Sequence, residues 1–127
     1  MIDCSLDSSV LIDLIKGRIG APKAVSQFTS PSISHVVFGE LLLGIYKADY
    51  PTEIFKVLEA LKDITILHAD AVTATLYAQI RSELEKQGSS IPQNDIWIAA
   101  VTIQMGVPLI TRDQHFRRIS KLKVIDY

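Results

Sequence analysis

Short strand-like runs alternate with helix-patterned segments along this chain of 127 residues, and this order limits the fold more than any other feature. The strand-like runs cover residues 2–7, 31–37, 64–67, 107–111 and 123–127. Segments with apolar residues at helical spacing separate the first four runs. Because parallel strands need long crossover connections, this order predicts a central parallel sheet of four to five strands, with helices on both faces. Such sheets bind ligands at the C-terminal ends of their strands.

The helical segments carry start and stop signals in their side chains. We expect helices over residues 8–17, 21–28, 39–50, 51–63 and 71–87, and a last helix that ends at Gly106. Asp70 is a predicted N-cap because its carboxylate can accept the first free amide groups of a helix. Gly88 is a predicted stop, because glycine readily adopts the left-handed conformation that ends a helix.

Length and composition favour a single globular domain over residues 1–127. With 48% hydrophobic and 21% charged residues, the chain can bury a core of its own. The start MIDCSLD lacks a basic signal region, and no run reaches the roughly 18 apolar residues of a membrane span. We therefore expect a soluble cytoplasmic protein with no membrane partner. The single cysteine, Cys4, excludes an internal disulfide, and we expect it to be buried.

Two carboxylates stand alone in otherwise uncharged segments. Asp95 is the only Asp, Glu, Lys or Arg in residues 88–110, and Glu40 is the only one in residues 25–45. A lone buried carboxylate costs several kcal/mol unless a partner, a cation or protonation relieves it. Each of these acids therefore calls for a compensating group.

Two further acids occupy matching places in the expected topology. Asp7 ends the first strand and Asp113 follows the fourth, so both lie at the sheet edge where Glu40 and Asp95 are also expected. Four carboxylates at one edge repel one another unless a cation is present. Oxygen ligands suit Mg²⁺ or Mn²⁺. Zinc is disfavoured, because the chain has one cysteine and its three histidines show no ligand spacing.

Three of these acids also have ordinary structural explanations. Asp7 can simply turn the chain, and Asp113 can be a loop acid. Asp95 can favour a helix N-terminus behind an Asn94 cap. Glu40 has no comparable explanation, because it is expected one turn inside an apolar helix. The coincidence of four acids therefore favours a shared site.

The C-terminal part is locally basic although the formal net charge is −1. Residues 112–123 hold five basic residues and one acid, which indicates either a solvated face or a contact for phosphate. For Arg112 we favour phosphate. Asn94 and Thr111 lie next to acids in the sequence, and either serve as cap and strand-end polarity or hydrogen-bond a carboxylate or a metal-bound water.

Two other side chains allow both structural and functional interpretations, and two more have a single expected place. His115 can act as a general base, but we expect a structural role for it. Trp97 can stack a base, although packing against a neighbouring helix is the preferred interpretation. We expect Phe116 in the core, and Asp13 to point to solvent.

Four motifs, taken together, resemble a known family. LDSSVLID, GELLLG, NDIWIAA and TRDQHFRRI are similar in order and spacing to the PIN-domain ribonucleases, and within them to the VapC-type toxins of prokaryotic toxin–antitoxin pairs. The resemblance covers essentially the whole chain. It implies a PIN-like three-layer α/β/α fold and metal-dependent hydrolysis of RNA. The implied catalytic quartet, binding Mg²⁺ or Mn²⁺, is Asp7, Glu40, Asp95 and Asp113.

Supporting roles follow from the same comparison and from the neighbouring residues. The family often has Thr-Asn after its first Asp, whereas this chain has Ser8 and Ser9. Residues expected to support the ligands by hydrogen bonds are Ser8, Asn94 and Thr111. Residues expected to contact RNA are Arg112, Arg117 and Arg118.

The resemblance also implies partners. Family members look like toxins that cut transfer RNA or other structured RNA, form homodimers, and are silenced by a small VapB-like antitoxin. The antitoxin tail fills the active-site groove, and helix 39–50 with its successor resembles the walls of that groove.

Other function classes remain open on the sequence. A phosphatase with an aspartate nucleophile would have a second Asp at the position where this chain has Ser9. A receiver-like or adaptor module would bind Mg²⁺ without RNA turnover. A PIN nuclease of RNA processing would share the site but lack an antitoxin gene nearby.

Overall fold

Five parallel strands form one sheet in the order β3-β2-β1-β4-β5. The computed structural model describes residues 1–18, 20–48 and 51–127, with the backbone alone for residues 51–55. The strands are Cys4–Leu6 (β1), Pro31–Ser34 (β2), Thr65–Leu67 (β3), Leu109–Ile110 (β4) and Val124–Ile125 (β5). The predicted α/β fold with a parallel sheet is therefore confirmed.

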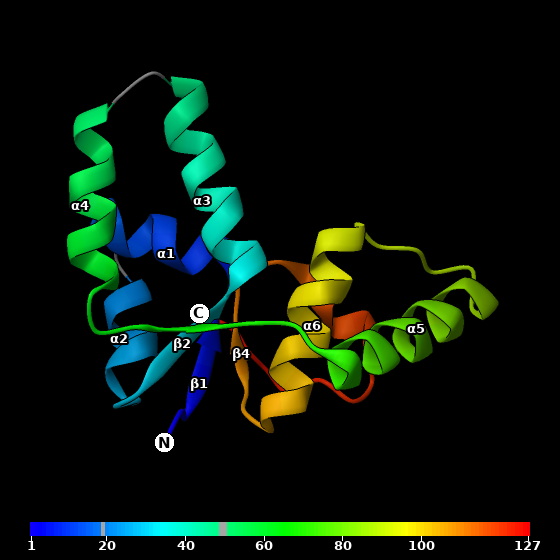
Figure 1. Cartoon of the computed structure of the whole chain (residues 1–127). Coiled ribbons are helices and arrows are strands. Elements are labelled where there is room, and N and C mark those ends of the chain that lie inside the picture. Colours follow the sequence, from blue (N-terminus) through cyan, green and yellow to red (C-terminus); the bar gives the residue numbers. More distant parts are fainter. Residues whose placement is uncertain (19, 49–50) are drawn as a thin grey trace.

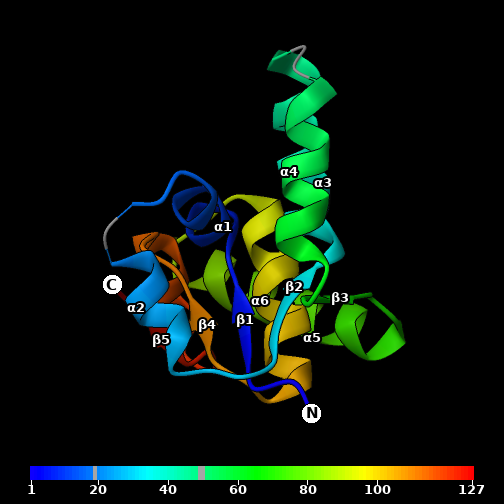
Figure 2. The ribbon, with the colours of Figure 1, turned by 90° about the vertical axis from the view of Figure 1, so that its left-hand side faces the viewer.

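Helices cover both faces of this sheet (Figure 1). They are Ser8–Ile15 (α1), Ala21–Ser26 (α2), His35–Ala48 (α3), Pro51–Leu61 (α4), Ala71–Lys86 (α5), Gln93–Met105 (α6) and the short 3₁₀ helix Gln114–Arg118 (η1). Helices α1 and α2 lie on one side of the strands and α5 and α6 on the other, which gives the expected three layers. Helices α3 and α4 run side by side away from the sheet, as the turned view also shows (Figure 2).

The core lies between the strands and the two helical layers. Leu6 of β1, Ile33 of β2 and Leu109 of β4 are completely buried. Leu11 of α1 and Ile98 of α6 belong to the same core cluster, and each is at most 2% exposed. Among the described ranges, no helix is both long and apolar enough to cross a membrane.

Two side-chain expectations fall in this core. Phe116 is fully buried, and Cys4 is buried in β1, as expected from the sequence. Burial raises the pKa of the Cys4 thiol to about 12, with the nearby Asp3 carboxylate as a smaller cause. The thiol is therefore a small core group and not a reactive one.

The strand order reverses between β1 and β4, and this places two chain exits side by side. Strand β1 pairs with β2 on one side and with β4 on the other. Leu6 lies opposite Ile110 in the register, and the Asp7 amide donates to the Ile110 carbonyl at 3.1 Å. Residues that follow β1 and β4 therefore leave the sheet next to each other, at the position where such folds bind ligands.

Local signals set the ends of the long helices as predicted. The Asp70 carboxylate accepts the amides of Val72 and Thr73 at 3.0 and 3.2 Å, and the Thr73 hydroxyl accepts the Asp70 amide at 3.0 Å. This capping box satisfies amides that have no partner within the helix. Gly106 ends α6 in the left-handed conformation, at φ +69°.

The second strand is shorter than the sequence predicted. Residues 35–37 were expected in the strand because valine favours strands, but they form the first turn of α3. The Ser34 hydroxyl accepts the Val37 amide at 3.1 Å, so a side-chain cap starts the helix there. The predicted continuation of this helix over residues 49–50 lies outside the described residues.

The N-terminus of α6 also differs from one interpretation of the sequence. Pro92 occupies the cap position and Asn94 is already the second helical residue, so Asn94 does not cap the helix. Asp95 lies in the first turn, where the helix dipole favours a negative charge.

Candidate metal-binding site

Asp7 connects β1 to α1 and is almost entirely buried, with 4% of its surface exposed. It caps α1, because its Oδ1 accepts the Ser8 amide at 2.8 Å. Its Oδ2 accepts the Thr111 hydroxyl at 2.7 Å and the Ser9 hydroxyl at 3.4 Å. These bonds fix the carboxylate at the C-terminal edge of the sheet.

Thr111 joins the two neighbouring chain exits. Its fully buried side chain donates to Asp7 and accepts the Asp113 amide at 3.0 Å. Asp113 in turn caps η1, since its Oδ1 accepts the His115 amide at 2.9 Å. A single hydroxyl thus couples the positions of two acids that lie 106 residues apart in the sequence.

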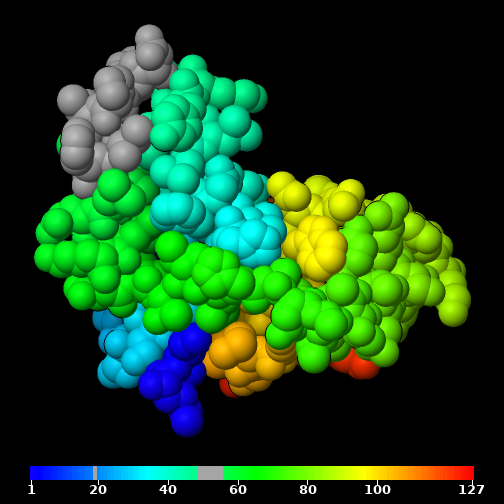
Figure 3. All heavy atoms as spheres, viewed as in Figure 1, coloured from blue at the N-terminus to red at the C-terminus, as the bar shows by residue number. Residues whose placement is uncertain are grey.

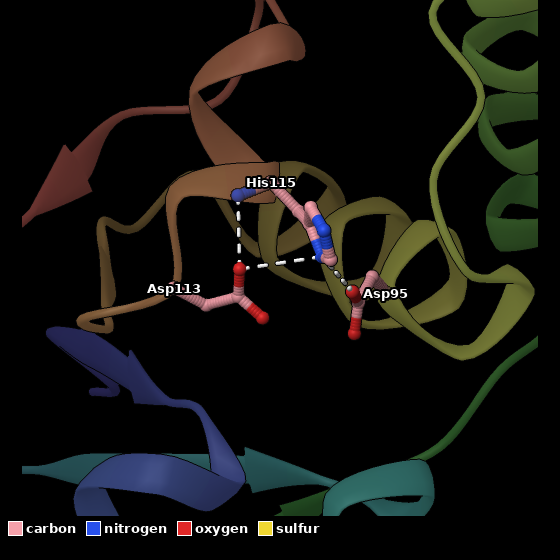
Figure 4. A group of neighbouring side chains, drawn as sticks. All are labelled: Asp95, Asp113 and His115. Carbon is pink, nitrogen blue, oxygen red and sulfur yellow. Dashed lines mark hydrogen bonds and ion pairs between the residues drawn. The ribbon is translucent and has the colours of Figure 1, made fainter.

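Asp95 reaches the same place from α6 (Figure 4). The His115 Nδ1 lies 3.3 Å from Asp95 Oδ2 and 3.3 Å from Asp113 Oδ1. One ligand atom from each of these three side chains lies within 4.8 Å of the other two. The three residues therefore form a compact group of oxygen and nitrogen donors.

Glu40 completes the group from the second turn of α3. Burial raises the pKa of its carboxyl, and the charges of Asp7 and Asp95 raise it further. Its buried Oε1 has no hydrogen-bond partner among the described residues. A buried carboxylate oxygen without a partner is costly, so this atom fits a site that takes a cation.

The other acids respond to the same crowding. Burial is the main cause that raises the pKa of Asp7, and the Asp113 charge adds to it, whereas the Thr111 hydrogen bond opposes it. Burial also raises the pKa of Asp95, with contributions from Asp7 and Asp113 and an opposing hydrogen bond from His115. Carboxylates that raise one another's pKa lie close together. Their oxygen atoms suit a hard divalent cation.

The predicted supporting residues have different surroundings. Thr111 makes the hydrogen bonds that its place in the sequence suggests. Ser8 reaches Asp7 through its backbone amide, and the hydroxyl that contacts Asp7 belongs to Ser9 instead. Asn94 is exposed, and within the described part of the chain its side chain makes no hydrogen bond to a site carboxylate.

The predicted RNA-binding arginines all have protein partners. Arg112 pairs with Asp13 at 3.0 Å, and Arg118 donates to the Ser90 carbonyl at 3.1 Å. Arg117 pairs with Asp126. The side chains of Arg112 and Arg117 are about half exposed, at 48% and 56%.

Three expectations for single side chains can be compared with the structure. Asp13 was expected in solvent, but this is wrong, because it is 2% exposed. Trp97 stacks on Tyr77 of α5, with ring centroids 4.0 Å apart, so it packs against a neighbouring helix as preferred. His115 was expected to be structural, and the structure puts it between two site acids. Only its spacing of two residues from Asp113 hinted at this contact.

The sequence is similar to known proteins along nearly its whole length. Residues 5–122 match the PIN domain family. The chain is 32% identical to Ribonuclease VapC2 of Haemophilus influenzae, over 97% of this chain and 96% of that protein. It is 31% identical to Ribonuclease VapC5 of Mycobacterium tuberculosis, over 87% of this chain and 83% of that protein.

The fold is also similar to that of chains in solved structures. The crystal structure of VapBC2 from Rickettsia felis bound to a promoter DNA fragment contains a chain that matches with a TM-score of 0.87, at 26% identity, covering 99% of this chain and 98% of that one. VapBC-1 from nontypeable Haemophilus influenzae gives a TM-score of 0.85 at 27% identity, over 99% and 98% of the two chains. The chain therefore belongs to the PIN domain family and, within it, to the VapC ribonucleases.

Proposed function

We propose that this protein is the toxin of a VapBC-type pair and acts as a Mg²⁺- or Mn²⁺-dependent endoribonuclease on transfer RNA or another structured RNA. One observation carries the proposal: acids from separate elements gather at the strand switch point, where burial and the charges of neighbouring carboxylates raise the pKa values of Asp7, Glu40 and Asp95. Such an arrangement is costly without a cation and useful with one.

The residues that would hold the cation are Asp7, Glu40, Asp95 and Asp113, with His115 as a further donor beside the last two. A bound divalent cation supplies an activated water at neutral pH and stabilises charge on the phosphate group. Hydrolysis by water needs no 2′-hydroxyl nucleophile.

The protein's own groups contribute orientation. Thr111 holds Asp7 and the chain at Asp113 in a fixed relation, since it bonds both. The His115 Nδ1 lies between Asp95 and Asp113, 3.3 Å from one oxygen atom of each, where it can serve as a further ligand. These contacts organise the site before RNA arrives, which reduces the reorganisation that catalysis requires.

RNA would approach the hollow between α3 and the N-terminal end of α6, which Figure 3 shows as a concave surface. The exposed parts of Arg112, Arg117 and Arg118 would contact phosphates from the basic C-terminal stretch. Because each guanidinium already has one protein partner, these contacts would use its remaining N–H groups.

A VapB-like antitoxin is the proposed partner. An open apolar groove of about 540 Å³ lies between α1, α3 and α4. Its lining includes Ile12, Leu41 and Ile45, and also Glu40 of the site. An apolar antitoxin segment in this groove would cover the acids as well. The VapBC structures from Rickettsia felis and Haemophilus influenzae are complexes of related chains. We further propose a homodimer in the cytoplasm, where RNA is accessible.

The decisive experiment is cleavage of a total transfer-RNA pool by purified protein freed of any antitoxin, with Mg²⁺, with Mn²⁺ and with EDTA. We expect discrete fragments that need the metal and disappear in Asp95→Asn. Asp63→Asn is the matched control, because Asp63 is an exposed acid just before β3. Metal binding by a protein that leaves transfer, ribosomal and messenger RNA uncut would contradict the proposal and favour a non-catalytic Mg²⁺-binding module.

A further inference from the structure

Asp13 is a buried carboxylate outside the proposed metal site. It lies near the end of α1 and only 2% of its surface is exposed. It accepts hydrogen bonds from Arg18, at 3.1 Å, from Arg112, at 3.0 and 3.3 Å, and from the Tyr127 hydroxyl. The Tyr127 hydrogen bond is the main cause that lowers the pKa of Asp13, followed, against the opposing effect of burial, by the charges of Arg112 and Arg18. Asp13 is therefore an ionised junction of three chain segments.

One of these segments carries site residues. Arg112 stands between Thr111 and Asp113 in the sequence. Thr111 bonds Asp7 at the start of α1, and Arg112 pairs with Asp13 six residues further along the same helix. The loop after β4 is thus attached to α1 at two points.

Two attachments to one rigid helix define a direction as well as a position. At a rise of about 1.5 Å per residue, the two acids are separated by about 9 Å along the helix axis. The Thr111 amide also donates to the Ile125 carbonyl at 3.1 Å, so the second attachment acts on the residues that follow Thr111. With the second in place, the next residue, Asp113, is directed toward Asp95 and His115.

We propose that Asp13 is a positioning residue, which acts through Arg112 to hold Asp113 and Thr111 in the geometry that binds the metal. The inference rests on the proposed function, because it concerns the same metal site. Among the described residues, no hydrogen bond joins Asp13 to a carboxylate of the metal site, and on this proposal Asp13 does not contact the RNA. Its effect passes through the guanidinium of Arg112, whose planar fork matches a carboxylate.

The chain contains a matched control for this idea. Arg18 also pairs with Asp13, and its side chain is 51% exposed, close to the 48% of Arg112. Arg18 follows α1 in the sequence and carries no site residue beside it. Removing either Arg18 or Arg112 takes away one cation and one ion pair of Asp13. Only the removal of Arg112 also detaches the loop after β4 from Asp13.

The test measures binding of Mn²⁺ alone, by calorimetry and by electron paramagnetic resonance, at a temperature well below the unfolding midpoint of every variant. Loss of a side chain that orients metal ligands weakens metal binding by about 10- to 100-fold. We expect losses in this range for Asp13→Asn and Arg112→Ala, and a change below about twofold for Arg18→Ala. The double variant should bind about as weakly as either single variant, because both break one link.

Arg112→Lys provides a second variant in case Asp13→Asn does not fold, since lysine keeps the charge but not the fork. Unchanged Mn²⁺ affinity in Arg112→Ala and Arg112→Lys would overturn the positioning role, and so would an equal loss in Arg18→Ala. If wild-type protein binds Mn²⁺ but cuts no RNA, the proposed function fails while the affinity comparison still decides the role of Asp13. If wild-type protein binds no Mn²⁺, both proposals fail.

Discussion

Replacing Thr111 by valine should destabilise the metal-free protein by about 2–4 kcal/mol. Valine keeps the shape of the side chain, which is fully buried, but removes a hydroxyl with two partners. The Asp7 carboxylate loses a donor at 2.7 Å, and the Asp113 amide loses an acceptor at 3.0 Å. A hydrogen bond to a charged group contributes about 1.5–3 kcal/mol and a neutral one about 1 kcal/mol.

Urea unfolding in EDTA at pH 7.5, followed by circular dichroism, measures this difference. In thermal unfolding of a chain of this size, the same loss of stability corresponds to a fall of roughly 10 °C in the midpoint temperature. Thr102→Val is the matched control: Thr102 is equally buried, but its hydroxyl donates to the Ile98 carbonyl within α6, at 2.8 Å. That carbonyl is a helical acceptor in the same turn, so we expect a loss of at most about 1 kcal/mol. Equal losses in the two variants would refute the coupling of Asp7 to Asp113 through Thr111.

Three further outcomes follow from the electrostatics of the site. In EDTA, the free energy of unfolding should fall as the pH rises from about 4 toward neutrality. The raised pKa values of Asp7, Glu40 and Asp95 make the folded state bind more protons than the unfolded state in this range. Thermal melts at several pH values measure this change, and a flat profile contradicts it. Glu40→Gln should stabilise the metal-free protein by about 1 kcal/mol and reduce the rise in midpoint that Mg²⁺ causes, whereas Asp63→Asn should change neither. His115→Ala should weaken Ni²⁺ binding about tenfold in calorimetry and Mg²⁺ binding much less, because Ni²⁺ prefers imidazole nitrogen; equal losses would exclude His115 as a ligand.

Local signals were sufficient for the parts of the fold that depend on neighbours in sequence. The Asp70 cap and the Gly106 stop need only the adjacent backbone, and both occur as predicted. Residues 35–37 show the limit of such signals. Their valines favour a strand, but the Ser34 hydroxyl caps a helix there and Val37 is fully buried within it. Packing and the cap therefore outweigh the intrinsic preference.

The site was predictable to the extent that topology alone determines it. In a parallel sheet all strands end at the same edge, so acids just after strands, or early in the following helices, are candidates for one site. The sequence therefore identified Asp7, Glu40, Asp95 and Asp113 as a group, and their roles as ligands stay predictions. Topology did not predict which single atoms make hydrogen bonds. The hydroxyl groups that donate to the Asp7 carboxylate belong to Ser9 and Thr111, and not to Ser8.

The sequence by itself determined the succession of strands and helices along the chain, the family resemblance, and the gathering of acids at one edge of the sheet. These follow from the periodicity of apolar residues, from the motifs and from the direction of the chain. Only the tertiary structure decided the surroundings of Asp13, whose partners Arg112 and Tyr127 lie 99 and 114 residues away in sequence. The same holds for His115, which meets Asp95 where η1 packs against α6. Side-chain environments of this kind arise when distant segments pack together, and no local pattern of residues specifies them.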